Sequence, residues 1–184
     1  ELHAPLHEGS HTRLLADLNR SAHHPRVLGP WAQALGSVER RTVLARWHAP
    51  WRRAFAARLN TALAGGRPAL HLSIHSFTPI LNGARRPMHV GLLYDPSRTG
   101  ERALALALRR ELQRLRPDLL VALNRPYHGR SDGHVTALRR THGPKNYLGL
   151  EFETRNDLLR TPAAQREFGR LYAAAVRAAL SARD

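Results

Sequence analysis

Short apolar segments alternate along this chain with segments whose apolar residues recur every three or four positions. The apolar segments cover residues 69–75, 88–94, 119–123 and 147–153. The helical spacing occupies a stretch that starts near Pro50, then 101–115 and 162–182. Strands separated by helices favour a largely parallel sheet with helices on both faces. We therefore expect an α/β fold, a three-layer sandwich in which helices cover both faces of a mostly parallel, mixed central sheet.

Length and the absence of cysteine narrow the class of protein. The 184 residues suffice for one sizeable core and show no repeat or linker, so we expect a single domain over residues 1–184. Without cysteine, a disulfide scaffold, a cysteine-ligated zinc site and thiol catalysis are excluded. The apolar stretches are too short to span a membrane, and the first ten residues do not resemble a signal peptide. We expect a cytoplasmic protein with no membrane partner.

The net charge of +15 raises the question of nucleic-acid binding. Lys145 is the only lysine; the other basic residues are arginines in a chain also rich in alanine and leucine, which is typical of GC-rich coding. The arginines are scattered, as at Arg52, Arg53, Arg109 and Arg110, and scattered charge usually forms a solvated surface. A basic nucleic-acid-binding module is kept as an alternative function, not as the leading one.

The segment around His75 is the first of three that place polar side chains near a strand end. In a strand, Leu70, Leu72 and Ile74 point to one face, while His71, Ser73 and His75 point to the other. Ligands of open α/β sheets lie beyond the carboxyl ends of the strands, where a histidine is well placed to bind a metal ion. The alternative is a buried, hydrogen-bonded histidine.

The second segment ends in two carboxylates, Glu151 and Glu153, on the face opposite Leu150 and Phe152. An unpaired carboxylate is costly to bury, so a charge there indicates a partner or a function. A glutamate beside a metal ion can act as general base toward water. The alternative is an ion pair between one glutamate and Arg155, which we favour for Glu151.

The third segment is Asp17-Leu18-Asn19-Arg20. An asparagine next to an arginine offers a neutral donor and a planar guanidinium, a combination that suits a carboxylate. The alternative is a helix cap followed by a surface arginine.

Further polar residues fit a substrate pocket. Arg86 follows a glycine-containing turn and is a candidate for a second carboxylate or a polarised carbonyl, with a surface role as the alternative. Asn124 ends a strand, so we expect its side chain to point into the same crevice, and Tyr127 begins a long polar loop as a lid residue would. The loop also contains histidines at irregular spacings, which we expect to be exposed or at most proton-shuttling: His128, His134 and His142.

Taken in their order along the chain, with the Asn19-Arg20 segment first and the Glu153 segment last, the three segments resemble the metallocarboxypeptidase arrangement. The similarity to its bacterial relatives, the N-formylglutamate amidohydrolase family, is more extensive. The shared motifs are residues 12–20, which end in Asp17-Leu18-Asn19-Arg20, then His75-Ser76-Phe77-Thr78-Pro79, residues 86–94, Asn124-Arg125-Pro126-Tyr127 and residues 151–158.

The resemblance implies a zinc-exopeptidase-like fold and a zinc-dependent amidohydrolase acting on a small-molecule N-acyl amino acid such as N-formyl-L-glutamate. It implies carboxylate recognition by Asn19 and Arg20, zinc ligation by His75 and general-base catalysis by Glu153. We add Arg86, Asn124, Tyr127 and Arg155 as candidate substrate-binding residues. A peptidase-like or cell-wall amidase activity at the same site is the alternative within enzymes.

One departure from the family concerns the zinc ligands. Family members carry an earlier strand with a His-Gly-Gly-like motif before the Asn-Arg pair, and this sequence has no such segment. His3, His7 and His11 do not reproduce its spacing. The resemblance therefore implies an N-terminally shortened domain with an incomplete set of Zn²⁺ ligands. We expect these 184 residues alone to bind zinc weakly and to show no amidohydrolase activity.

Overall fold

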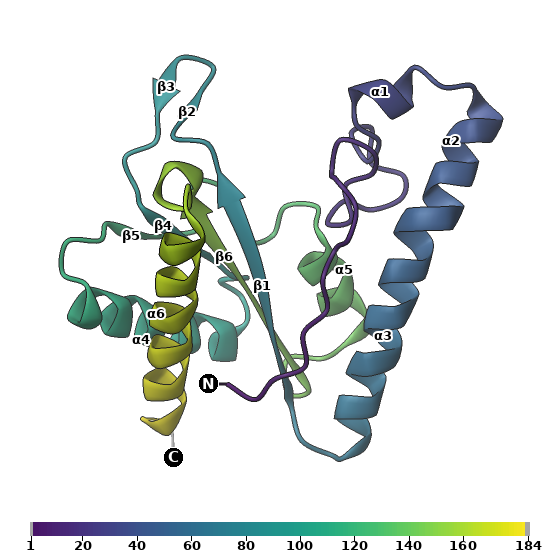
Figure 1. The fold of residues 1–184 in the computed structure, drawn as a ribbon. Coiled ribbons are helices and arrows are strands. Elements are labelled where there is room, and N and C mark those ends of the chain that lie inside the picture. Colours follow the sequence, from purple (N-terminus) through teal and green to yellow (C-terminus); the bar gives the residue numbers. More distant parts are fainter. Residues whose placement is uncertain (1, 183–184) are drawn as a thin grey trace. The chain divides into compact units, whose positions relative to one another are not determined.

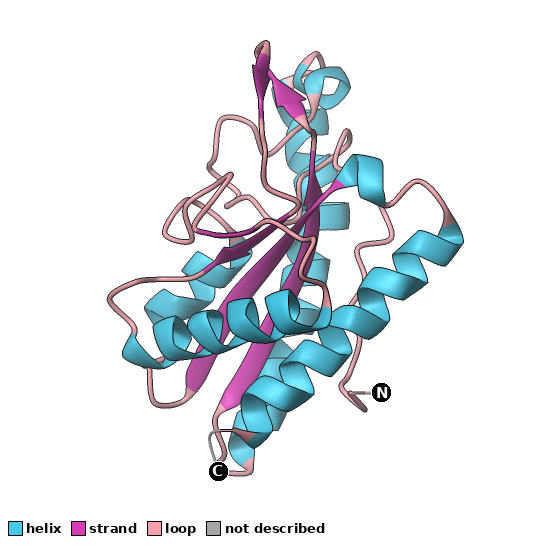
Figure 2. Cartoon of the chain, turned by 90° about the vertical axis from the view of Figure 1, so that its left-hand side faces the viewer, coloured by secondary structure: helices cyan, strands magenta, loops and turns pink. Residues whose placement is uncertain are grey.

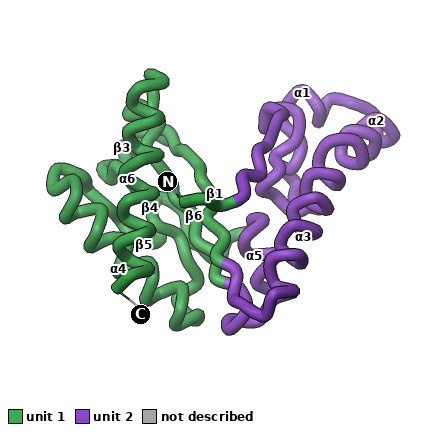
Figure 3. Tube along the Cα trace, turned by 60° about the horizontal axis from the view of Figure 1, so that its bottom comes forward, with its two compact units in different colours: residues 1–4, 70–131, 148–184 green, residues 5–69, 132–147 purple. Residues whose placement is uncertain are grey.

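A computed structural model describes residues 2–182, which divide into two compact units (Figure 1). Unit 1 comprises residues 2–4, 70–131 and 148–182, and unit 2 comprises residues 5–69 and 132–147; Figure 3 shows them in green and purple. No helix within residues 2–182 is long and apolar enough to cross a membrane. The expectation of a single domain stays a prediction.

The main sheet has four strands. Their order is β1 (Ala69–Phe77), β6 (Tyr147–Arg155), β4 (Val90–Leu93) and β5 (Val121–Leu123). Strand β4 is parallel to β5 and antiparallel to β6. Strands β1 and β6 start side by side, because the N–H of Ala69 donates to the carbonyl of Asn146 at 2.9 Å, and they run in the same direction (Figure 2). The predicted α/β fold with a mixed, mostly parallel sheet flanked by helices is confirmed.

One face of this sheet packs on the long helices of unit 1, α4 (Thr99–Leu115) and α6 (Pro162–Ser181). The predicted stripe of α4 is buried there, with Leu104, Leu108 and Leu112 at 0% exposure. Full burial of each such side chain contributes about 1.5–3 kcal/mol. Leu150 and Phe152 of β6 join this core, so the alternation of the strand sends the intervening residues to the opposite face.

Unit 2 is mainly helical. Its elements are α1 (Pro30–Gln33), α2 (Ser37–Val43), the π-helix η1 (Leu44–His48), α3 (Ala49–Ala64) and α5 (His134–Thr141). The helix predicted from Pro50 is α3, whose Leu59 packs with Leu138 of α5 and Tyr147. A second cluster includes Ala16, Leu28 and Ala32 of α1, and Leu44 of η1 packs against it.

Three local expectations need correction or completion. Alternating bulky residues make 11–18 a candidate strand, but these residues form turns closed by the carbonyl of Thr12, with one isolated bridge between Ala16 and Leu28. The long polar loop after β5 contains α5. A hairpin of β2 (Ile80–Leu81) and β3 (Ala84–Arg85) was missed, although its turn, Asn82-Gly83, has the positive φ angles and the composition of a two-residue hairpin turn. After β6 follows a short 3₁₀ helix, η2 (Asn156–Leu158).

Candidate functional site

His75 and Glu151 meet on the sheet face opposite the core of unit 1. Strands β1 and β6 are neighbours, and the Nε2 atom of His75 lies 3.6 Å from Oε2 of Glu151. Ser73, two residues earlier on the same face of β1, places its Oγ 2.8 Å from Nε2 of His75. Glu151 is buried and His75 is half-buried. The alternation of residues along β1 and β6 predicted His75 and Glu151 near these strand ends, and the structure brings the two side chains together.

Glu153 follows two residues later on the same face of β6 and is only 6% exposed. Its partner across the ladder on β4 is Gly91. A Cβ at Gly91 would lie 2.0 Å from the carbonyl oxygen of Arg125, so the absence of a side chain lets the loop after β5 approach the sheet beside Glu153. The negative charge of Glu153 also adds to the effect of burial in raising the pKa of Tyr172.

Arg155, the last residue of β6, donates hydrogen bonds to two neighbouring segments. Its Nε donates to Oδ1 of Asp157 at 2.8 Å, and its Nη1 donates to the carbonyl of Pro87 at 3.4 Å. The hydrogen bond from Arg155 holds the pKa of Asp157 below its usual value. The arginine therefore joins the end of β6 to the segment that leads into β4, and its role in substrate binding stays a prediction.

Arg86 and Tyr127, two predicted substrate residues from different segments of unit 1, are in contact. Nη1 of Arg86 donates to the hydroxyl of Tyr127 at 3.1 Å, and the guanidinium lies 5.1 Å from the centre of that ring. It also lies 5.8 Å from the ring of Phe77, at the end of β1. Cation–π contacts on two rings hold the guanidinium in place while leaving it half-buried rather than enclosed.

Asn124 organises the backbone between β5 and the following loop. It has a φ of +51°, a conformation in which asparagine is favoured among non-glycine residues. Its Oδ1 accepts hydrogen bonds from the N–H groups of Tyr94 at 3.1 Å and Gly129 at 3.0 Å. The side chain thereby fixes the ends of the loop that carries Tyr127; direct binding of substrate by Asn124 stays a prediction.

Asn19 and Arg20 lie in the turns of unit 2. Oδ1 of Asn19 accepts a hydrogen bond from the N–H of His134 at 2.7 Å, the first residue of α5. Nη1 of Arg20 donates to the carbonyl of Asp132 at 3.2 Å. The segment is a series of turns and begins no helix of its own, so the alternative of a cap on a following helix does not apply; Asn19 instead contacts the first turn of the distant helix α5. Sequence reasoning missed Asp132, which contacts this motif from a distant part of the chain.

The loop histidines differ from one another. Nδ1 of His128 accepts the N–H of Arg130 at 3.2 Å, and His128 is exposed. His134, expected to be exposed, is 5% exposed, because its ring packs on Trp51 and Phe55. His142 is half-buried beside the ring of Tyr147.

A catalytic zinc ion takes three protein ligands. Within residues 2–182, no group of three or more histidine, aspartate or glutamate side chains is arranged to hold a metal ion. His75 and Glu151 supply two donor groups, so the described residues do not by themselves fit a complete catalytic zinc site.

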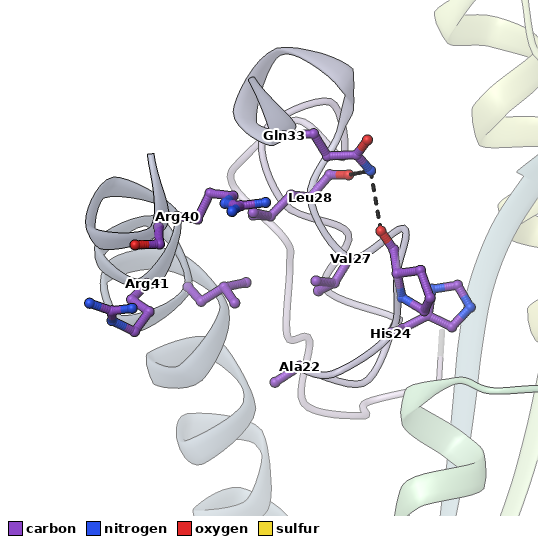
Figure 4. Close-up of a pocket in the computed structure, with 10 residues that line it drawn as sticks. Ala22, His24, Val27, Leu28, Gln33, Arg40 and Arg41 are labelled. Carbon is purple, nitrogen blue, oxygen red and sulfur yellow. Dashed lines mark hydrogen bonds between the residues drawn. The ribbon is translucent and has the colours of Figure 1, made fainter. Parts of the chain in front are cut away.

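Unit 2 also contains a pocket of about 280 Å³. Apolar side chains such as Val27 and Leu28 line it between Arg40 and Arg41 on one side and His24 on the other (Figure 4). None of the predicted site residues lines it.

Comparisons with known proteins bear on these motifs. The sequence profile of the N-formylglutamate amidohydrolase family matches residues 1–160. No curated protein matches the chain. Among solved structures, a gene product of Agrobacterium tumefaciens is similar with a TM-score of 0.75 and 28% identity, over 94% of this chain and 69% of that one. The N-formylglutamate amidohydrolase of Ralstonia eutropha JMP134 shares the fold with a TM-score of 0.61 and 20% identity, over 87% of this chain and 59% of that one.

The family profile thus extends from the turns that hold Asn19 and Arg20 to the end of β6 and beyond. It therefore covers the Asn19-Arg20 turns of unit 2 as well as His75, Glu151 and Glu153 on the strands of unit 1. This chain belongs to the N-formylglutamate amidohydrolase family.

Proposed function

We propose that this chain acts as a metal-dependent amidohydrolase on the N-formyl, or a similar N-acyl, amide of an amino acid such as N-formyl-L-glutamate. Family membership supports the amidohydrolase activity. The observation that carries the proposal is the buried carboxylate of Glu153, near the carboxyl end of β6 and on the same face as Glu151. A carboxylate in that position can accept a proton from the water that attacks the substrate.

Glu153 is the proposed general base. It takes a proton from the attacking water, whose oxygen forms a bond to the acyl carbon. The amide C–N bond then breaks, and the same proton passes to the departing nitrogen, so that an N-formyl substrate yields formate and the free amino acid. General-base catalysis of this kind contributes roughly 10²–10⁴-fold to the rate.

Charged and polar donors are proposed to select the substrate. Asn19 and Arg20 recognise the α-carboxylate, as the family resemblance implies. Arg86 with Tyr127 suits the second carboxylate of a dicarboxylic substrate, because the rings hold the guanidinium while it stays half-buried. Asn124 and Arg155 complete the proposed set of substrate residues at the ends of β5 and β6.

Zinc enters the proposal through the family resemblance, with His75 as a ligand. Since the described residues bring only His75 and Glu151 together, we propose His75 as one zinc ligand and assign no complete site to them. Calorimetric titration of the chain with Zn²⁺ is expected to show weak binding that falls further in His75→Ala. Tight, stoichiometric binding by the chain, unchanged in His75→Ala, would contradict the assignment.

A panel of substrates tests the proposed reaction. When the zinc site is complete and loaded, formate release from N-formyl-L-glutamate is expected, with slower release from N-formyl amino acids that lack the second carboxylate and from the α-amide derivative. Cleavage of dipeptides or of cell-wall peptides without formate release would favour the peptidase or amidase alternative. Salt-sensitive binding of DNA or RNA without turnover would favour the nucleic-acid alternative.

A further inference from the structure

The backbone of the Asn19-Arg20 motif is held by two side chains of one helical segment. Nε2 of His48 lies 2.8 Å from the carbonyl oxygen of Arg20. Nε of Arg52 donates to the carbonyl of Leu18 at 3.3 Å, and its Nη2 donates to the carbonyl of Asn19 at 3.2 Å. Three consecutive carbonyl groups are thus bound by a histidine and an arginine that are four residues apart, all within unit 2.

The helical segment explains why these two side chains reach the same backbone. Residues four apart lie on one side of a helix, so His48 and Arg52 face the turn together. His48 is the last residue of the π-helix η1, and α3 begins at the next residue. π-Helical turns are rare and often occur at functional sites. Here the turn ends on the residue that binds the motif.

The protonation of His48 suits this role. The side chain is 2% exposed, and burial lowers its pKa below the ordinary value. The neutral imidazole carries a single N–H, and with the proton on Nε2 that group donates to the carbonyl of Arg20. The charged groups near it are Arg52 and Asp17.

Other side chains hold the opposite, N–H side of the same backbone. Oδ1 of Asp17 accepts the N–H of Asn19 at 3.1 Å, and Oδ2 of Asp132 accepts the N–H of Ser21 at 3.0 Å. Buried backbone groups need partners, and this segment has no strand or helix of its own to supply them. The conformation of the motif therefore depends on its own Asp17 side chain and on side chains from other segments of unit 2.

We infer that His48 and Arg52 are positioning residues for carboxylate recognition: they fix the carbonyls of Leu18, Asn19 and Arg20 and thereby aim the side chains of Asn19 and Arg20. This inference rests on the proposed function, in which that pair binds the α-carboxylate of the substrate. Neither residue touches the substrate. Their loss is expected to weaken binding of free acids and to leave the chemical step little changed.

Kinetics of four variants test the role in recognition. His48→Ala and Arg52→Ala are expected to raise KM for N-formyl-L-glutamate about tenfold, since each removes hydrogen bonds to backbone carbonyls of the motif, while kcat changes little. The preference for the free acid over its α-amide should fall in parallel. His48→Gln, which retains an N–H donor, and Arg52→Lys, which retains the charge, should recover part of the loss. Arg53→Ala, at an exposed neighbouring position of α3, is the matched control and should match the wild type.

A second measurement does not depend on activity. Amide hydrogen exchange of residues 17–21 should become faster in His48→Ala and Arg52→Ala, with exchange in α6 unchanged. Should an alanine variant fail to fold, His48→Gln and Arg52→Lys provide the same comparison. Unchanged exchange of 17–21 in the folded variants would overturn the inference, and so would an equal loss of activity toward the free acid and the amide. Failure of the proposed function appears differently, as absence of formate release by the wild type with its zinc site complete and loaded, and leaves the exchange result valid.

Discussion

The two units hold their candidate functional residues in different ways. In unit 1, His75, Glu151 and Glu153 are carried by neighbouring strands whose other face is anchored in a core of fully buried side chains. In unit 2, Asn19 and Arg20 lie in turns that are held by single hydrogen bonds from other segments. A position on a sheet is fixed by many small contributions, whereas a position in such turns depends on a few polar contacts.

Because of this difference, we expect substitutions in the two units to have different effects. Loss of one core contact in unit 1 lowers the free energy of unfolding and leaves the order of the strands intact. Loss of one hydrogen bond in unit 2 changes the local conformation of the motif, because each backbone group there has a specific partner. The predictions below run from the largest expected effect to the smallest.

The core of unit 1 should show the largest effect. Leu108→Ala removes a fully buried side chain from α4 and is expected to lower the free energy of unfolding by about 2–5 kcal/mol. Leu106→Ala, two residues away on the same helix but 39% exposed, is the matched control and should change it far less. Urea denaturation followed by circular dichroism measures both. Equal losses in the two variants would show that the core does not anchor this unit.

Arg20→Ala should have the next largest effect, and on selectivity rather than on stability. Loss of a charged contact with a carboxylate costs on the order of 1.5–3 kcal/mol. The preference for N-formyl-L-glutamate over its α-amide should therefore fall by roughly one to two powers of ten in kcat/KM. Arg26→Ala, at an exposed loop position of unit 2, serves as the control. A variant as selective as the wild type would assign Arg20 to the surface.

Acidification should loosen the turns of unit 2 to a smaller extent. Burial lowers the folded-state pKa of His48 from 6.5, so the stabilisation of the neutral form is present above that value and is lost as the pH falls below it. Hydrogen-exchange protection of residues 17–21, corrected for intrinsic rates, is expected to fall between pH 7 and pH 5 while that of β6 is retained. His48→Gln should abolish this pH dependence, and a dependence retained in that variant would point to another group.

The sequence predicted the structure best where the spacing of apolar residues reflects which side chains are buried. The alternation along β6 separated Leu150 and Phe152 from Glu151, and the structure confirms the two faces. The spacing of leucines in α4 likewise identified the buried stripe. Such patterns are local, because one face of an element meets a core along its whole length.

The turns of unit 2 could not be predicted in the same way. His48, Arg52 and Asp132 contact the Asn19-Arg20 motif from about 30 to 110 residues away, and nothing in their own neighbourhoods signals this. The π-helical turn has no composition of its own to mark it. By contrast, the missed β2–β3 hairpin was signalled by Asn82-Gly83, a dipeptide typical of such turns.

The central claim is that Glu153 performs base catalysis in an amidohydrolase, and Glu153→Gln tests it most directly. The amide keeps the shape of the side chain but does not accept the proton from water. With formate release from N-formyl-L-glutamate as the measurement, we expect kcat to fall roughly 10²–10⁴-fold with the fold intact by circular dichroism. Glu151→Gln, on the same strand face, is the matched comparison. A Glu153→Gln variant with near wild-type rate, beside an inactive Glu151→Gln, would contradict the account and transfer the role of base to Glu151.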